Sequence, residues 1–107
     1  MPATYKVLGQ VCPAAATLTT LYTVPATKST LCSTLNVCNT GVSTTVRVAV
    51  RPAGEALNEK HYIVYDFPMD AHESLPLTQG ITLAESDVVS VYAANANVAF
   101  NLFGSEQ

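Results

Sequence analysis

Charged side chains are scarce in this chain of 107 residues, because only 12% of the positions are Asp, Glu, Lys or Arg. Globular domains usually have about twice this share, and apolar residues make up 49% here. These proportions exclude a disordered tail and a charge-laced coiled coil. The 5 basic and 8 acidic residues give a net charge of -3. Such a chain has no basic stripe for a run of phosphates, so we expect no nucleic-acid partner.

Cysteines are also few. The chain has 3, at positions 12, 32 and 38, so they cannot all pair within one chain. An odd number does not give the disulfide framework of a small secreted domain. On one extended strand, Cys32 and Cys38 would lie about 20 Å apart at about 3.3 Å per residue, which is beyond disulfide reach. We therefore expect that Cys12, Cys32 and Cys38 are free thiols that behave as small buried hydrophobes.

Long apolar runs are absent as well. No stretch approaches the roughly 20 apolar residues that a membrane helix needs, so we expect no membrane partner. Met1 to Thr4 contains no positive segment followed by an apolar run, which predicts that there is no secretory signal. We expect synthesis and folding in a reducing cytoplasm, and a single domain over residues 1–107.

The usual catalytic and phosphate-binding signatures do not occur. The chain lacks Gly-x-Gly-x-x-Gly, a phosphate-binding Gly-Lys-Ser/Thr, His-Glu-x-x-His and Gly-x-Ser-x-Gly. A zinc site needs close-spaced ligand pairs, which Cys32, Cys38 and the distant His61 and His72 do not supply. Pairing a cysteine nucleophile with either histidine would be an arbitrary choice. We expect no enzymatic activity, no catalytic residues, no cofactor and no metal.

The densest polar segment is residues 66–73, which contain Asp66, Asp70, His72 and Glu73. Their oxygens and imidazole are groups that bind divalent cations, but the aspartate spacing and the glycine of a calcium loop are absent. A solvated turn between two strands explains the same residues through turn chemistry alone. We favour the solvated turn.

Alternation of apolar and other residues dominates the remaining sequence. The clearest case places Val46, Val48 and Val50 on one face of a strand and Arg47 and Arg51 on the other. Similar strand-forming runs, rich in β-branched and aromatic residues, cover residues 5–10, 19–24, 31–37, 62–65, 89–91 and 98–102.

Short breaks with turn residues separate these runs, and no helices alternate with them. We therefore predict an all-β fold: an antiparallel β-sandwich of about eight strands with jelly-roll or Greek-key-like connections. Residues 53–60 are the one candidate for a short helix of one or two turns, and a long crossover loop is the alternative.

The outward positions of the predicted strands carry Thr, Ser, Ala and Asn rather than Lys or Glu. Such a face can be covered by another subunit without the cost of burying a charge, but a solvated threonine-rich face fits the same residues. Arg47 and Arg51 are spaced so that both can reach one partner, and we predict that they are interface anchors. The alternative is that they form the solvent face of an edge strand.

Strand and turn stretches along nearly the whole chain carry a family resemblance. They are Val7-Leu8-Gly9-Gln10, Pro13-Ala14-Ala15, Leu21-Tyr22-Thr23-Val24-Pro25-Ala26, residues 46–53, Gly80-Ile81-Thr82-Leu83-Ala84, Asp87-Val88-Val89 and Phe100-Asn101-Leu102-Phe103-Gly104. In these stretches the chain resembles small proteins of tailed bacteriophages that are described as structural or uncharacterised. The resemblance implies a shared fold and a virion component, and it transfers no functional residues.

From this resemblance we expect a non-enzymatic capsid decoration (cement) protein, a homotrimer that binds the lattice of the major capsid protein. A tail-associated component, such as a fibre, baseplate or tail-tip piece with a host surface glycan as ligand, is the alternative. A free-standing carbohydrate-binding or enzymatic domain is a third hypothesis. The 5 tyrosines and the absence of tryptophan argue against a lectin, and we expect most tyrosines to pack in the core or on the sheets.

Overall fold

The computed structural model describes residues 3–107, and within this range it contains nine strands and two short 3-10 turns, with no α-helix. Met1 and Pro2, which belong to the segment expected to lack a signal, lie outside the described residues. The predicted all-β fold is confirmed. The elements are β1 (Thr4–Val11), β2 (Thr19–Thr23), β3 (Thr30–Asn39), β4 (Thr44–Arg51), η1 (Pro52–Gly54), η2 (Glu59–His61), β5 (Tyr62–Met69), β6 (Ser74–Leu77), β7 (Ile81–Leu83), β8 (Val88–Ala93) and β9 (Val98–Glu106).

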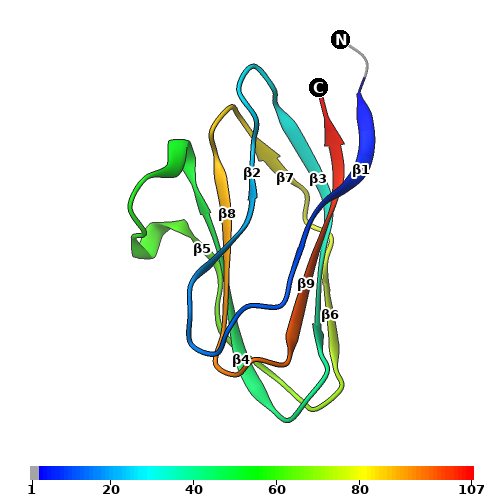
Figure 1. Cartoon of the computed structure of the whole chain (residues 1–107), viewed down its shortest axis with the longest axis vertical. Helices are drawn as coiled ribbons and strands as arrows, with labels where there is room; N and C mark the ends of the chain where they lie inside the picture. The colour runs from blue at the N-terminus through cyan, green and yellow to red at the C-terminus, as the bar shows by residue number, and fades with distance from the viewer. Residues whose placement is uncertain (1–2) are drawn as a thin grey trace.

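Two antiparallel sheets pack face to face, and Figure 1 shows them edge-on. Sheet A has the order β1-β9-β3-β6, with β7 also paired to β3, and sheet B has the order β2-β8-β4-β5. β6 and β7 pair with successive parts of the same strand, so together they occupy one position in sheet A. With these two counted as one strand, the order is that of a jelly roll, which is one of the two types of connection that were predicted.

The alternation in β4 places its side chains as expected. Val46 and Val48 are 0% exposed and face the space between the sheets, whereas Arg47 and Arg51 lie on the outer face of sheet B. The valines belong to one buried cluster that also contains Phe100 of β9. Burial of each such side chain contributes about 1.5 to 3 kcal/mol, so this apolar layer holds the two sheets together.

The edge strands are where the structure differs from the sequence prediction. β5 continues to Met69 although its predicted end was residue 65, and Pro68 lies within it, paired with Thr45. β6 likewise contains Pro76. Both strands lie at sheet edges, where one side of the strand has no neighbour. A proline, which has no N–H to donate, is tolerated there because no ladder hydrogen bond is lost on that side.

Residues 53–60 do not form an α-helix. The turns η1 and η2 lie at the two ends of residues 52–61, so the alternative, a long loop, is correct. It does not cross between sheets, because β4 and β5 are neighbours in sheet B, and we call it the crossover loop only for its path over the outer face of that sheet. This loop packs over the outer face of sheet B, against β4 and β8. Neither turn nor any other element between residues 3 and 107 is a helix long and apolar enough to cross a membrane.

Candidate functional site

Arg47 and Arg51, the predicted interface anchors, lie on the outer face of a central strand, because β4 is flanked by β8 and β5. The interpretation that they mark an edge strand is therefore wrong. Arg47 lies between the rings of Tyr65 and Tyr92, with its guanidinium carbon 4.5 and 4.4 Å from the two ring centroids. The same guanidinium donates to Asp66, with Nε 2.6 Å from Oδ1 and Nη2 3.3 Å from Oδ2. Arg47 thus has three partners within its own sheet.

A local distortion of β5 brings Tyr65 and Asp66 to the same arginine. Side chains alternate between faces along a regular strand, so neighbouring residues normally point to opposite sides. Asp66 has a left-handed backbone with φ 49, and the register of β5 against β4 shifts around it. Aspartate tolerates this conformation better than bulkier residues do. The distortion is a β-bulge that redirects one side chain, a feature found next to functional sites.

Arg51 is held in place by the crossover loop. Its Nε lies 3.2 Å from Ser90 Oγ, and its Nη1 donates to the Glu55 carbonyl oxygen at 2.9 Å. Below this loop Ser90 is only 1% exposed although it points outward from β8. The structure therefore gives Arg51 an intramolecular role, fastening residues 52–61 onto sheet B. That Arg47 and Arg51 also anchor an interface stays a prediction.

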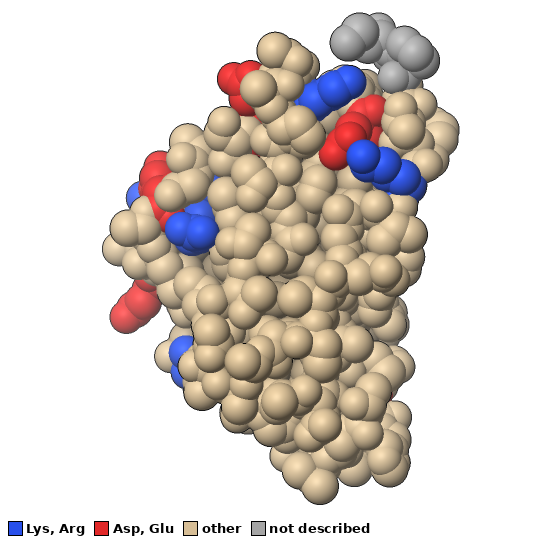
Figure 2. All heavy atoms as spheres, viewed as in Figure 1, with Lys and Arg blue, Asp and Glu red and all other residues tan. Residues whose placement is uncertain are grey.

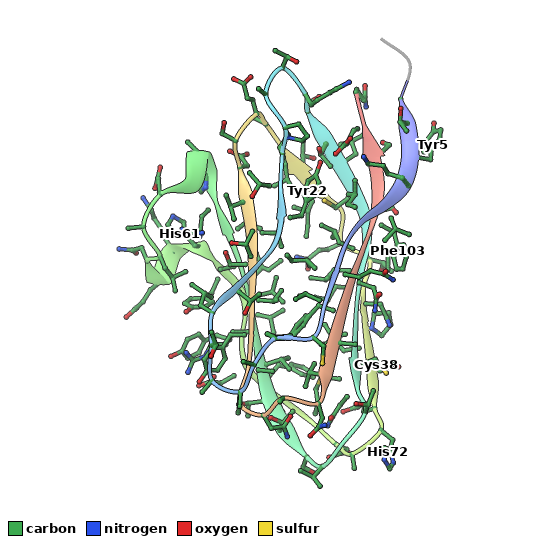
Figure 3. The ribbon with its side chains drawn as sticks, in the orientation of Figure 1. Tyr5, Tyr22, Cys38, His61, His72 and Phe103 are labelled. Carbon is green, nitrogen blue, oxygen red and sulfur yellow. The ribbon has the colours of Figure 1, made fainter. Side chains whose placement is uncertain are left out.

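The outer face of sheet A has a different character. Tyr5 and Val7 of β1 are 83% and 49% exposed, and Leu31 of β3 is 47% exposed. Tyr5 and Leu31 are both paired with Ser105 of β9, and Val7 is paired with Phe103, so these side chains form two adjacent cross-strand rows. Tyr5, Leu31 and Phe103 border a shallow groove of about 670 Å3. Figure 3 shows Tyr5 and Phe103 on this outer side of the sandwich.

Amide side chains continue this face toward the other end of the molecule. Gln10 donates to Asn101 at 2.7 Å, and Asn101 is paired with Asn36 on the next strand. Among the residues that the structure describes, the strands of sheet A contain only two charged side chains, Lys6 and Glu106, which pair with each other at 2.9 Å. We give the name sheet A face to the outer surface of this sheet, which carries Tyr5, Val7, Gln10, Leu31, Asn101 and Phe103. Figure 2 likewise shows the charged atoms gathered at one end and one side of the molecule.

The cysteines and histidines do not come together. All three cysteines, which lie within the described residues, are free, and Cys32 and Cys38 lie on the same strand, as expected. The expectation that all three are buried is wrong, because Cys32 is buried but Cys38 is only partly buried and Cys12 is exposed. Burial raises the pKa of Cys32 to about 11, which keeps this thiol protonated and unreactive. Cys38 lies on the sheet A side, whereas His61 belongs to the crossover loop and His72 to a distant turn (Figure 3).

His61 has a structural role in the crossover loop. It is 4% exposed, and its Nδ1 accepts the backbone N–H of Asn58 at 3.0 Å. Its Nε2 lies 3.4 Å from a carboxylate oxygen of Glu55. These contacts close the turn η2 and fix the course of the loop.

The acidic segment 66–73 is divided between two places. Asp66 pairs with Arg47 in β5, whereas Asp70, His72 and Glu73 belong to the following turn, in which the Asp70 N–H donates to Glu73 Oε1 at 2.8 Å. No group of three or more His, Cys, Asp or Glu residues that could hold a metal ion occurs among residues 3–107. The predicted turn is therefore correct for residues 70–73 and wrong for residues 66–69, which belong to β5.

The exposed tyrosines are the surface residues that sequence reasoning missed. Tyr22 is 8% exposed and packs in the core, as expected, but Tyr5 and Tyr65 are 83% and 58% exposed. The signal for Tyr5 was its alternation with Val7, which lies two residues further along one face. For Tyr65 no sequence signal existed, because its position depends on the bulge at Asp66.

Comparison of the chain with protein-family models, with curated proteins and with solved structures finds no match.

Proposed function

We propose that this protein is a non-enzymatic virion structural protein, a capsid decoration protein that binds the lattice of the major capsid protein as a homotrimer. The observation that carries the proposal is the sheet A face, which combines exposed Tyr5, Val7 and Leu31 with amide side chains and no unpaired charge among the described residues. Interface cores are depleted in charge and enriched in aromatic residues in the same way.

The rigidity of this face supports a role in assembly. Its side chains belong to paired strands of a sandwich, so the backbone is already ordered and loses little conformational entropy when a partner covers the face. Jelly rolls occur in viral capsid domains, which agrees with the phage resemblance, but they also occur in lectins. The fold alone therefore does not decide between the two, and the proposal depends on the face.

The number of copies per virion tests the proposal. We expect the protein on the order of hundreds of copies in each particle, because a shell is built from many equivalent subunits. Gel densitometry against the major capsid protein measures this ratio. A handful of copies would contradict decoration and favour a tail-associated component.

A pair of variants tests the face itself. Tyr5→Glu combined with Leu31→Glu introduces charge at two exposed positions of the sheet A face, and we expect purified particles to lose the protein. Val42→Glu is the matched control, because Val42 is 70% exposed but lies in the β3–β4 loop, outside this face. Equal loss of both variants from particles would show that the sheet A face is not the contact.

A further inference from the structure

A second hollow, of about 420 Å3, opens beside β5 and is lined by Glu59, Tyr62 and Tyr65. The two tyrosine rings lie with centroids 4.8 Å apart and planes at 74°. They therefore form two walls that meet almost at a right angle. Glu59, the first residue of η2, adds a carboxylate to this hollow. Aromatic walls with a nearby carboxylate are the groups that bind an organic cation.

The wall formed by Tyr65 is fixed before any ligand arrives. The Arg47 guanidinium lies over this ring at 4.5 Å, and Asp66 holds Arg47 with two hydrogen bonds. Ordering of side chains is a large cost of binding, so a ring that is already held contributes more affinity than a mobile one. The same cluster also shows that the Tyr65 ring accepts a guanidinium, because Arg47 is bound in this way within the chain.

The charge of the hollow favours a cation over an anion. Glu59 has no salt-bridge partner within residues 3–107, whereas the neighbouring Lys60 and His61 both face Glu55, at 3.9 and 3.4 Å. The nearby Asp66 is neutralised by Arg47. One carboxylate in the hollow is thus uncompensated, in a chain with a net charge of -3.

The surroundings of the hollow favour a cation that is attached to a protein. Ile63, next to Tyr62 on the same edge strand, is 38% exposed. It adds an apolar side chain close to Tyr62, so a polypeptide that carries the cation gains a contact that a free amine lacks. We propose that the Glu59–Tyr62–Tyr65 hollow binds a lysine or arginine side chain of a partner protein. This proposal is independent of the virion assignment.

Ring-proton NMR of the tyrosines tests the proposal directly. The probes are N-acetyl-lysine methylamide and N-acetyl-arginine methylamide, with the norleucine analogue as a neutral control of similar shape and glucose as a saccharide control. We expect shifts of Tyr62 and Tyr65 with a basic probe, at an affinity about tenfold or more above that of norleucine. Equal binding of norleucine, binding of glucose alone, or no shift at the solubility limit of the basic probes would each overturn the proposal.

Two glutamine variants separate the hollow from general charge effects. Glu59→Gln changes an exposed residue, so the fold is expected to persist, and we expect the basic probes to bind about tenfold more weakly while norleucine is unaffected. Glu55→Gln removes a carboxylate from the same loop but outside the hollow, and we expect at most a small effect on probe binding. An equal loss in both variants would overturn the assignment to this hollow.

Discussion

Residues from different strands share one buried carboxylate. Glu106 is 8% exposed, and it pairs with Lys6 Nζ at 2.9 Å and accepts the hydroxyl hydrogen of Tyr22. Thr30 Oγ1 lies 2.8 Å from the same hydroxyl and, because Tyr22 gives its hydrogen to Glu106, Thr30 is the donor in that second bond. Burial and then the bond to Glu106 raise the pKa of Tyr22 to about 12. This network joins β1, β2, β3 and β9 at one end of the sandwich.

The stability of the protein should fall in acid because of Glu106. The hydrogen bonds from Lys6 and Tyr22 lower the pKa of Glu106 in the folded protein below the ordinary value of 4.5. The unfolded chain binds this proton more tightly, so the stabilisation is present above pH 4.5 and disappears as the pH falls through the folded-state pKa. Glu106→Gln should therefore be less stable than the parent chain at neutral pH, by a margin that narrows in acid. Urea unfolding of both proteins at neutral and at acidic pH checks this. A difference in unfolding free energy that does not change with pH would contradict it.

At the scale of elements, the strands approach one another closely at two glycines. A Cβ atom at Gly104 of β9 would lie 2.0 Å from the Leu31 carbonyl oxygen of β3, and one at Gly9 of β1 would lie 2.3 Å from the Leu21 carbonyl oxygen of β2. The register of β3 against β9 shifts close to the first of these contacts. The absence of a side chain at Gly104 thus lets the two central strands of this end of sheet A pair.

Gly104→Ala should lower the free energy of unfolding by more than about 2 kcal/mol, because the backbone of β3 or β9 must move. Gly80→Ala is the comparison: Gly80 has φ +76 and no neighbour within 4 Å of its Cβ position, so only backbone strain of about 1 kcal/mol is expected there. Denaturant unfolding of both variants measures the difference. A Gly104 variant as stable as the Gly80 variant would refute the close approach.

The same scale explains what could be predicted from the sequence. Alternation located seven of the nine strands, all except β6 and β7, and the face of Arg47, since both depend on residues close together in the chain. The partners of Arg47 were not predictable, because Asp66 and Tyr92 come from other strands and meet Arg47 only through the order β8-β4-β5. β6 was hard to recognise because Pro76 interrupts a short strand. The sheet A face was not predictable for the same reason as the partners of Arg47. Both depend on the order of the strands, which is set by residues far apart in the chain.

At the scale of the whole molecule, the two outer faces differ. The sheet A face is apolar or amide-lined, whereas sheet B carries Arg47, Arg51 and the crossover loop. On our proposal, neighbours cover the sheet A face and the charged face of sheet B stays outward, which would give the protein a defined orientation in an assembly. Variants on one face can therefore be compared with variants on the other to show which face contributes to binding a partner.

Replacing both Arg47 and Arg51 with Ala tests whether the sheet B face also anchors a partner. We expect weaker association with particles or in the oligomer, together with a loss of unfolding free energy of about 1 to 2 kcal/mol, because Arg47 also bonds to Asp66 and Arg51 also holds the crossover loop. Val48→Ala should instead lower the free energy of unfolding by about 1 to 3 kcal/mol and leave association unchanged, since Val48 is 0% exposed in the core. Thermal unfolding and particle binding of both variants check this. An equal loss of particle binding in the arginine variant and in the Val48 variant would show that the faces are assigned wrongly.

The pairing of the first strand with the last has a practical consequence. Thr4 lies opposite Glu106 in the ladder between β1 and β9, so the two ends of the described chain leave the sandwich at the same pole (Figure 1). A short linker can therefore join the two ends. The chain can then be opened in the crossover loop, between β4 and β5, with the two sheets kept intact. A cargo attached at either end would project from that one pole and leave the flat sides of the sandwich unobstructed.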